Sequence, residues 1–426
     1  MTRVVVVGAG FAGFYAAQTL HRRLRGSTEV VLVNPTDYFL YVPLLPEVMA
    51  GILDPRRIAV PLASRLPEVR LAVGTAHTID HDAHRVTYRD PDGRDQHLDY
   101  DHVLITVGSV NKLLPIPGVN EYAHGFRNLA EAVFLRDHLV RQIELADSTD
   151  DEDERTARLT FVVVGAGYTG TEVAAQGVLA TRATLRKHPR LRGRTARWLL
   201  LDTADRVLPG LRERLSHTAS RTLAERGVEI MTGTSVKEAM AEGVLLSDGS
   251  SVPTRSLIWC VGVRPDPLVE MLGLPTERGR LIVEPDLSVP GKPGMWACGD
   301  AAAVPDLAEP GQVTSMTAQH AQRQGATAGR NIAAALGRGN ARSYKHRNLG
   351  FVVDLGGYDS AADPLGVPLS GFPAKVVTRG YHLSVMPGNR VRTAVDWTEH
   401  ALLGSELQRL DLVQPTQVPL DTRPPS

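Results

Sequence analysis

The hydrophobic and polar positions of the chain follow two periods, that of buried strands and that of helices. Runs of almost exclusively apolar residues, typical of strands covered on both faces, occur at residues 3–7, 30–33, 103–107, 160–164, 198–201 and 257–261. Small residues, or apolar residues three or four apart, predict helices at residues 14–23, 128–145, 173–179, 216–226 and 317–336. Strands and helices that alternate in this order predict an α/β protein with parallel sheets.

The first predicted strand runs directly into a glycine-rich turn. Residues 8–13 read Gly-Ala-Gly-Phe-Ala-Gly, and a helix and a second strand ending at Asn34 follow. In such a unit the first glycine allows a tight turn, the second lets the backbone approach a pyrophosphate, and the third packs the helix against the strand. The helix N-terminus then attracts phosphate. An ordinary glycine-rich turn is the alternative, and the complete strand–helix–strand context argues against it.

The same pattern occurs a second time. Residues 162–170 read Val-Val-Val-Gly-Ala-Gly-Tyr-Thr-Gly, and the strand at 198–201 ends in Asp202. A carboxylate there can accept bonds from both ribose hydroxyls and repels a 2′-phosphate, which favours NADH over NADPH. Arg206 nearby leaves this preference open. The repeat predicts two Rossmann-like dinucleotide-binding domains in one chain.

Composition narrows the classes of partner. The 47 Lys and Arg residues balance 47 Asp and Glu residues, so we expect no nucleic-acid partner. The acidic run 147–154 lacks the ordered turn glycines of a calcium loop, so we interpret it as a solvated surface loop and expect no metal site. Cys260 and Cys298 have neither metal-ligand nor redox-pair spacing, which indicates free thiols in a reducing compartment.

The sequence has no signal-peptide pattern at its start and no apolar run of about twenty residues. We therefore expect a cytoplasmic protein that is peripheral to a membrane at most, on the inner face of the cell membrane.

Three further segments carry candidate chemistry. The apolar strand before Gly299 and Asp300 ends at small residues, where a carboxylate can accept a bond from the ribityl hydroxyls of a flavin and also cap a helix. The aromatic, proline-rich segment 35–47 either covers a flat cofactor or packs in the core. The helix that carries Gln319 has a face of small residues, which allows close approach to another helix or a ring.

From residue 344 the pattern indicates a third unit. We predict short strands at 350–357 and 390–396, a helix at 375–385 and an amphipathic helix at 397–412. The last dozen residues are rich in proline, so we expect them to be disordered or draped over the surface.

With these motifs in place, residues 3–397 resemble the two-dinucleotide-fold flavoprotein reductases of the pyridine nucleotide-disulfide type. They are most similar to the type II NADH:quinone oxidoreductases. The marker motifs are the two glycine loops, Thr106-Val107-Gly108, Trp259–Gly262, Gly299–Ala301 and Ala318–Ala321. The resemblance implies an FAD-binding domain in two parts, an NADH-binding domain inserted between them, and a C-terminal α+β domain. The implied boundaries are 1–117 and 286–342 for FAD, 118–285 for NADH and 343–426 for the last domain.

The resemblance also implies the site residues. Two of them are catalytic candidates: Glu172 lies between the nicotinamide and flavin sites, and Gln319 lies beside the acceptor quinone. The implied cofactor-binding residues are Gly8, Ala9, Gly10, Phe11, Ala12, Gly13, Asn34, Ala76, Gly108, Gly165, Gly167, Gly170, Asp202, Gly262, Gly299 and Asp300. The chain departs from the family at Asn34, where many such folds have an acid, and at Val42, Glu47 and Arg323, which stand in place of glutamines.

The expected activity is that of a non-proton-pumping NADH dehydrogenase. Hydride passes from NADH to FAD, and two electrons then pass to a quinone-like acceptor. A soluble NAD(P)H reductase for a protein or natural product, a non-catalytic NADH-sensing flavoprotein and a flavin monooxygenase are alternatives; for the last we see no substrate domain. A homodimer and a weak membrane contact through the C-terminal region are left open.

Overall fold

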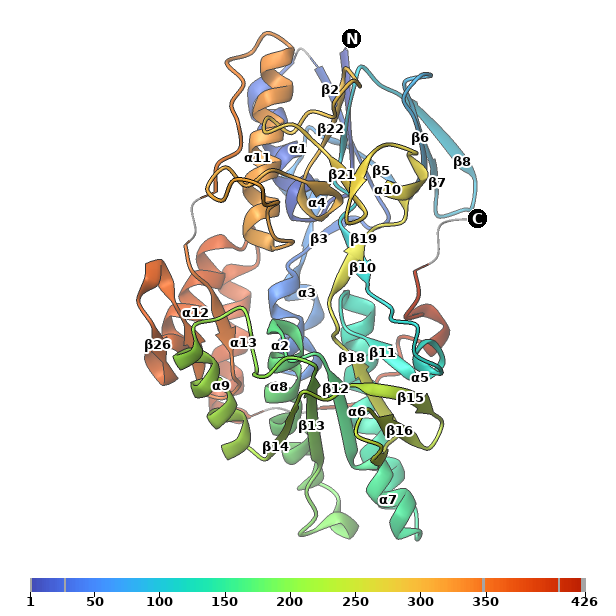
Figure 1. The fold of residues 1–426 in the computed structure, drawn as a ribbon, viewed down its shortest axis with the longest axis vertical. Helices are drawn as coiled ribbons and strands as arrows, with labels where there is room; N and C mark the ends of the chain where they lie inside the picture. The colour runs from blue at the N-terminus through green and yellow to red at the C-terminus, as the bar shows by residue number, and fades with distance from the viewer. Residues whose placement is uncertain (1, 27, 347–348, 405–406, 423–426) are drawn as a thin grey trace.

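The computed structural model describes residues 2–26, 28–346, 349–404 and 407–422 of the 426-residue chain. Two five-stranded parallel sheets lie toward opposite ends of an elongated molecule, and the C-terminal segment packs beside them (Figure 1). The α/β fold with two Rossmann-like units is therefore confirmed.

The first sheet is built from strands that are distant in the sequence. Its order is β22 (Met295–Ala297), β9 (His102–Ile105), β1 (Thr2–Val7), β2 (Thr28–Asn34) and β5 (Arg70–Val73). All four pairings are parallel. The predicted strand at 3–7 is buried at its centre, because helices cover it: Val4, Val5 and Val6 are 0% exposed.

Two helices pack side by side on this sheet, α1 (Phe11–Leu24) and α11 (Ala318–Ala335) (Figure 1). Their backbones touch where Gly325 faces Ala12: a Cβ at Gly325 would lie 2.0 Å from the Ala12 carbonyl oxygen. The small-residue face predicted on the later helix thus serves close helix packing. A three-stranded meander completes this part, with β6 (Thr75–Asp80), β7 (Arg85–Arg89) and β8 (Asp95–Asp99).

The second sheet comes from the residues between β9 and β22, which confirms the insertion. Its order is β11 (Ala123–Gly125), β18 (Ser256–Trp259), β12 (Thr160–Val164), β13 (Arg197–Asp202) and β14 (Val228–Thr232). The main helices are α6 (Leu129–Ser148), α8 (Tyr168–Leu185) and α9 (Glu213–Glu225). A second meander contains β15 (Val236–Met240), β16 (Gly243–Leu246) and β17 (Ser251–Pro253).

The two parts are joined by a short antiparallel pair, β10 (Ser109–Asn111) with β19 (Val263–Pro265). A small sheet follows, with β20 (Thr276–Glu277), β21 (Arg280–Ile282) and β23 (Ala302–Ala303). Because β21 pairs with β23, a strand placed by sequence in the NADH domain lies against the second FAD segment. The boundary at 285, like the other domain boundaries, stays a prediction.

The aromatic segment after β2 forms short elements of its own. They are β3 (Tyr38–Leu40), α2 (Leu45–Met49), α3 (Pro55–Ile58), β4 (Ala59–Pro61) and α4 (Leu62–Arg65). Phe39 and Tyr41 are at most 1% exposed, and the ring of Phe11 lies 5.0 Å from that of Phe39. Of the two interpretations of this segment, core packing is the one that the structure shows for these two rings. Beyond them, α2 reaches α6 and α8 of the inserted unit.

The C-terminal unit contains a sheet of β24 (Val352–Asp354), β25 (Ser360–Ala362) and β26 (Leu369–Ser370), with α12 (Gly371–Val385) and α13 (Arg390–Leu403). The predicted strand at 390–396 was wrong, because these residues open α13. The alternation of Val391 and Val395 misled the prediction: both are exposed, whereas Thr393 and Trp397 face inward with helical spacing.

The acidic run and the C-terminal segment differ from what the sequence predicts. The acidic run at 147–154 is not all loop, because the Asp151 side chain caps α7 (Glu152–Arg158) by accepting from the N–H groups of Asp153 and Glu154. The amphipathic helix expected to reach residue 412 ends at Leu403; residues 405–406 lie outside the described part. The C-terminal tail lies on the surface of the second unit, and the side chain of Leu420, which is 2% exposed, packs into the core of that unit. Residues 423–426 lie outside the described part.

Candidate functional site

The first glycine loop connects β1 to α1, and its three glycines differ in what surrounds them. Gly8 has φ +99°, and a Cβ there would lie 2.5 Å from the Thr106 carbonyl oxygen. A Cβ at Gly13 would lie 1.7 Å from the carbonyl oxygen of Gly8. Gly10 has no heavy atom within 4 Å of such a Cβ. The loop therefore packs tightly at its first and third glycines and stays open at the second, where a phosphate needs room.

Asn34 stabilises this loop from the end of β2. Its Oδ1 accepts a hydrogen bond from the Ala9 N–H at 2.8 Å, and its Nδ2 donates to the Thr36 carbonyl oxygen at 2.8 Å. The next strand is tied to the same point, since the Gly74 N–H donates to the Asn34 carbonyl oxygen. Ala76, two residues further on, is brought to this edge of the sheet and is partly exposed.

The second glycine loop has the same construction in the inserted unit. A Cβ at Gly165 would lie 2.3 Å from the Cys260 carbonyl oxygen, one at Gly170 would lie 1.8 Å from Gly165, and Gly167 is open. Asp202 takes the place of Asn34: its Oδ2 accepts from the Ala166 N–H at 2.5 Å and its Oδ1 from the Ala204 N–H at 2.8 Å. The sequence repeat is thus a repeat of hydrogen bonds as well.

Gly299 and Asp300 lie where the first sheet meets α11. The Gly299 N–H donates to Oε1 of Gln324 at 2.8 Å, and the Ser109 hydroxyl donates to Oδ2 of Asp300 at 2.5 Å. A Cβ at Gly299 would lie 3.0 Å from that of Ala12. These contacts place Asp300 close to the first glycine loop. Gly108 and Gly262, both with positive φ, lie three residues after the ends of β9 and β18.

The two catalytic candidates, Glu172 and Gln319, come from different helices and both contact the start of the C-terminal unit. The Asp354 N–H donates to Oε1 of Glu172 at 2.9 Å, and Nε2 of Gln319 donates to the Gly350 carbonyl oxygen at 2.7 Å. Oε1 of Gln319 is buried and has no hydrogen-bond partner among the described residues. Burial raises the pKa of Glu172 well above its usual range, which favours the protonated form of its carboxyl group.

A cluster of buried charged side chains surrounds Glu172. Lys375 forms an ion pair with Asp354 at 2.5 Å, and the two side chains are 4% and 11% exposed. Glu47 is 3% exposed, and burial followed by the charge of Asp354 raises its pKa to about 7. Three carboxyl groups therefore lie close together with one ammonium group, and this concentration of negative charge favours the protonated forms of Glu47 and Glu172.

Sequence reasoning missed several members of this arrangement. Asp354 and Lys375 were not singled out, although a charge inside the apolar run 351–355 is a signal for a buried partner. Glu47 was noted only as a departure from a family pattern. Ser109 and Gln324, which hold Asp300 and Gly299, carry no sequence signal of their own, because their partners lie 191 and 25 residues away.

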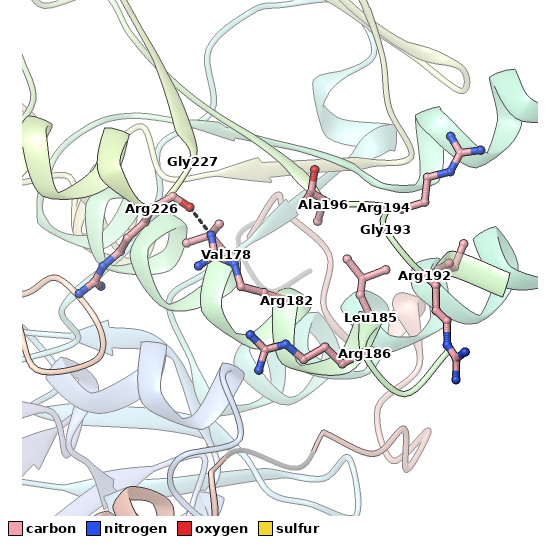
Figure 2. A pocket seen from close by; sticks show the side chains of 12 residues that line it. Val178, Arg182, Leu185, Arg186, Arg192, Gly193, Arg194, Ala196, Arg226 and Gly227 are labelled. Atoms are coloured by element: carbon pink, nitrogen blue, oxygen red, sulfur yellow. Dashed lines mark hydrogen bonds between the residues drawn. The ribbon is translucent and has the colours of Figure 1, made fainter. Parts of the chain in front are cut away.

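The cavities that the structure shows lie elsewhere. One of about 390 Å³ lies in the inserted unit and is lined by Arg182, Arg186, Arg192, Arg194 and Arg226 together with smaller residues (Figure 2). In the described part of the chain, no group of three or more His, Cys, Asp or Glu side chains is arranged to hold a metal ion. The described helices also include none that is both long and apolar enough to cross a bilayer.

Comparison with known proteins agrees with this geometry. The family of pyridine nucleotide-disulphide oxidoreductases matches residues 2–325. The type II NADH:quinone oxidoreductase NdhA of Mycobacterium tuberculosis is 31% identical over 411 residues, covering 92% of this chain and 85% of the relative. The demethylphylloquinone reductase NdbB of Synechocystis is 29% identical, covering 94% and 96%.

The fold is also that of a solved structure, NDH2 from Plasmodium falciparum in complex with NADH. The TM-score is 0.87 at 16% sequence identity, and the match covers 96% of this chain and 99% of that one. At this identity the similarity concerns the fold alone.

Proposed function

We propose a function on the premise that the chain belongs to the pyridine nucleotide-disulphide oxidoreductases and, within them, to the type II NADH:quinone oxidoreductases. It is an FAD-dependent NADH dehydrogenase that delivers two electrons to a quinone acceptor. The observation that carries this function is the doubled glycine loop, closed in one unit by Asn34 and in the other by Asp202.

The residues present fit both cofactors. Gly10 and Gly167 each leave open the space that a Cβ would fill, at the N-terminus of α1 and of α8. A pyrophosphate is attracted to such a position by unpaired N–H groups and the helix dipole. We assign FAD to the first loop, with Asn34, Ala76, Gly299 and Asp300, and NADH to the second, with Asp202 and Gly262.

FAD, when bound, supplies the two-electron redox chemistry, and the protein supplies position and charge. We assign to Glu172 a positioning role between the two ring sites: Oε1 accepts the Asp354 N–H, and burial raises the pKa of the carboxyl group. We assign to Gln319 the orientation of the acceptor, because its buried Oε1 has no hydrogen-bond partner in the described part of the chain. Neither residue is assigned as an obligate acid or base.

The experiment follows the absorbance of the purified protein during anaerobic addition of NADH and then of a short-chain menaquinone analogue. We expect a yellow protein that bleaches with NADH and regains its colour with the quinone. Bleaching without recovery would retain both cofactor sites and reject the quinone. A colourless protein that takes up no FAD would reject the function. The variant Glu172→Gln tests the role of Glu172 separately. Unchanged rates of FAD reduction by NADH and of quinone reduction would show that Glu172 has no role in either half-reaction.

We also propose that the protein is cytoplasmic and attaches peripherally to the inner face of the cell membrane. Its cysteines are free thiols, as a reducing compartment requires. The surface in support is the apolar face of the C-terminal helices, made of Phe372, Val376, Val391, Val395, Leu402 and Leu403, each at least 56% exposed. Apolar side chains left in water on two neighbouring helices favour burial in a lipid interface.

Vesicle flotation tests the attachment. The wild-type protein is expected to float with liposomes, whereas Leu402→Glu with Leu403→Glu is expected to stay at the bottom and keep its turnover of a water-soluble quinone. Met271→Glu, on an exposed site of the inserted unit (49% exposed), is the matched control. A wild-type protein that does not float but sediments as a dimer, and becomes monomeric in the double variant, would assign this face to a homodimer.

A further inference from the structure

The segment after α11 turns back alongside this helix (Figure 1). A groove lies between the segment and the helix. The helix contributes residues three or four apart, which share one face. The returning segment contributes residues 342–345. The groove has a volume of about 350 Å³ and is lined by Arg323, Ala326, Thr327, Arg330, Arg342, Ser343, Tyr344 and Lys345.

The charge of this groove is of one sign. Four of its eight lining residues are cations and none is an acid. The side chains of Arg330, Arg342 and Lys345 form no ion pair with any of the described residues. Burial and the charges of Arg342 and Arg23 lower the pKa of Arg330, as expected where cations repel one another.

The groove is held in shape by buried polar contacts. Asn331 is 0% exposed; its Oδ1 accepts the Arg342 N–H at 3.0 Å and its Nδ2 donates to the Arg342 carbonyl oxygen at 2.9 Å. The Tyr344 N–H donates to the Pro285 carbonyl oxygen at 2.7 Å. The backbone of residues 342–344 is thus fixed over α11, which holds Arg342 beside the helix.

The arginines around the other cavity are arranged differently. Arg194 pairs with Glu152 at 2.8 Å and Arg226 with Asp359 at 2.7 Å. Figure 2 shows the guanidinium groups of Arg192 and Arg194 extending away from each other. Carboxylates thus balance part of that cavity's charge, whereas Arg330, Arg342 and Lys345 in the groove on α11 form no ion pair with any described residue.

We propose that the groove on α11 binds a phosphate group, either of a free phosphate compound or of an anionic lipid head group. A phosphate group offers several acceptor oxygens and one negative charge as a diester or up to two as a monoester, and arginine recognises it with two parallel hydrogen bonds. The site is separate from both glycine loops, so it does not depend on the proposed reaction.

Two binding assays on the FAD-loaded full-length protein distinguish the sources. One is calorimetric titration with inorganic pyrophosphate at low salt. The other is flotation with vesicles of phosphatidylcholine, with or without phosphatidylglycerol. Pyrophosphate binding supports a free phosphate ligand, and flotation that requires phosphatidylglycerol supports a lipid head group.

Paired variants keep the test specific. Arg330→Gln with Arg342→Gln is expected to weaken the observed binding about tenfold or more. Arg186→Gln with Arg192→Gln removes the same charge from exposed arginines of the other cavity and is expected to leave binding unchanged. Lys345→Gln, at an exposed position, serves if the first variant does not retain FAD. Binding of neither probe by the wild-type protein, or equal weakening in both double variants, would overturn the proposal.

Discussion

Glu47 in α2 and Trp397 in α13 are 350 residues apart, and the indole N–H of Trp397 donates a hydrogen bond to Oε2 of Glu47. The two side chains are 3% and 4% exposed. Beside them Arg57 forms an ion pair with Asp396 at 2.8 Å. The last helix is therefore fixed by buried polar contacts to the segment that follows the first βαβ unit.

The carboxyl group of Glu47 makes stability depend on pH. Its folded-state pKa of about 7 lies above the ordinary value of 4.5, so its contribution to stability is complete below about pH 4.5 and is lost as the pH rises through 7. Glu47→Gln keeps an acceptor for Trp397 and has no charge to bury. We expect the variant to match the wild type at pH 5 and to be more stable at pH 8.5, by about 3 kcal/mol at most.

Urea unfolding at the two pH values measures this difference. Glu309→Gln, at an exposed position, is the control and is expected to show no such pH dependence. Equal stabilities of Glu47→Gln and the wild type at both pH values would show that Glu47 titrates normally.

The buried pair Asp354–Lys375 predicts a strong asymmetry between single and double substitution. Lys375→Met leaves the Asp354 carboxylate without its cation and is expected to cost about 3–5 kcal/mol in free energy of unfolding. Asp354→Asn with Lys375→Met removes both charges and is expected to recover much of that loss. Denaturant unfolding of the wild type, the single variants and the double variant gives the free energies for this double-mutant cycle. Arg85→Met, in the exposed pair with Asp99 (48% and 65% exposed), is expected to cost less than about 1 kcal/mol.

The glycines of the first loop are expected to respond differently to the same substitution. Gly13→Ala places a Cβ 1.7 Å from the Gly8 carbonyl oxygen, so we expect loss of folded protein. Gly10→Ala meets no heavy atom within 4 Å, so the chain is expected to fold and to retain much less FAD, because the methyl group occupies the phosphate position. Circular dichroism and the ratio of flavin to protein absorbance measure the two effects. Full FAD content in Gly10→Ala would contradict the assignment of this loop.

Asp202 is expected to set the preference for NADH. Asp202→Asn removes the charge that repels a 2′-phosphate. In the wild type two backbone N–H groups each bond one carboxylate oxygen of Asp202, and the variant leaves a single oxygen for both of them. Binding of both nucleotides is expected to weaken, but the ratio of kcat/KM for NADPH to that for NADH is expected to rise about tenfold, or ~1.4 kcal/mol. Glu229→Gln, an exposed acid on the adjacent strand β14, is expected to leave the ratio unchanged. An unchanged ratio in Asp202→Asn would assign the preference to other residues.

The sequence alone determined the two nucleotide folds, and the resemblance to the family implied the insertion of one in the other. Their signals are local: an apolar strand, glycines at fixed spacing and a polar residue at the end of the next strand fall within about forty residues of each other. Backbone sterics dictates these glycines, since Gly8 and Gly165 have φ values that other residues rarely adopt. The capped helix α6, which begins after Asn128, follows from an equally local pattern.

Only the tertiary structure decided what surrounds Glu172. Glu47, Asp354 and Lys375 come from α2, β24 and α12, and no spacing in the chain relates them. The raised pKa of Glu47 follows from its burial and from the charge of Asp354, and both depend on how the three units pack. The same applies to residues 390–396, for which the sequence pattern predicted a strand. These residues form a helix because Thr393 and Trp397 pack against the preceding units, and Val391 and Val395 remain exposed to solvent. Local sequence encodes backbone conformation, whereas burial and charge are properties of residues that meet only in the folded chain.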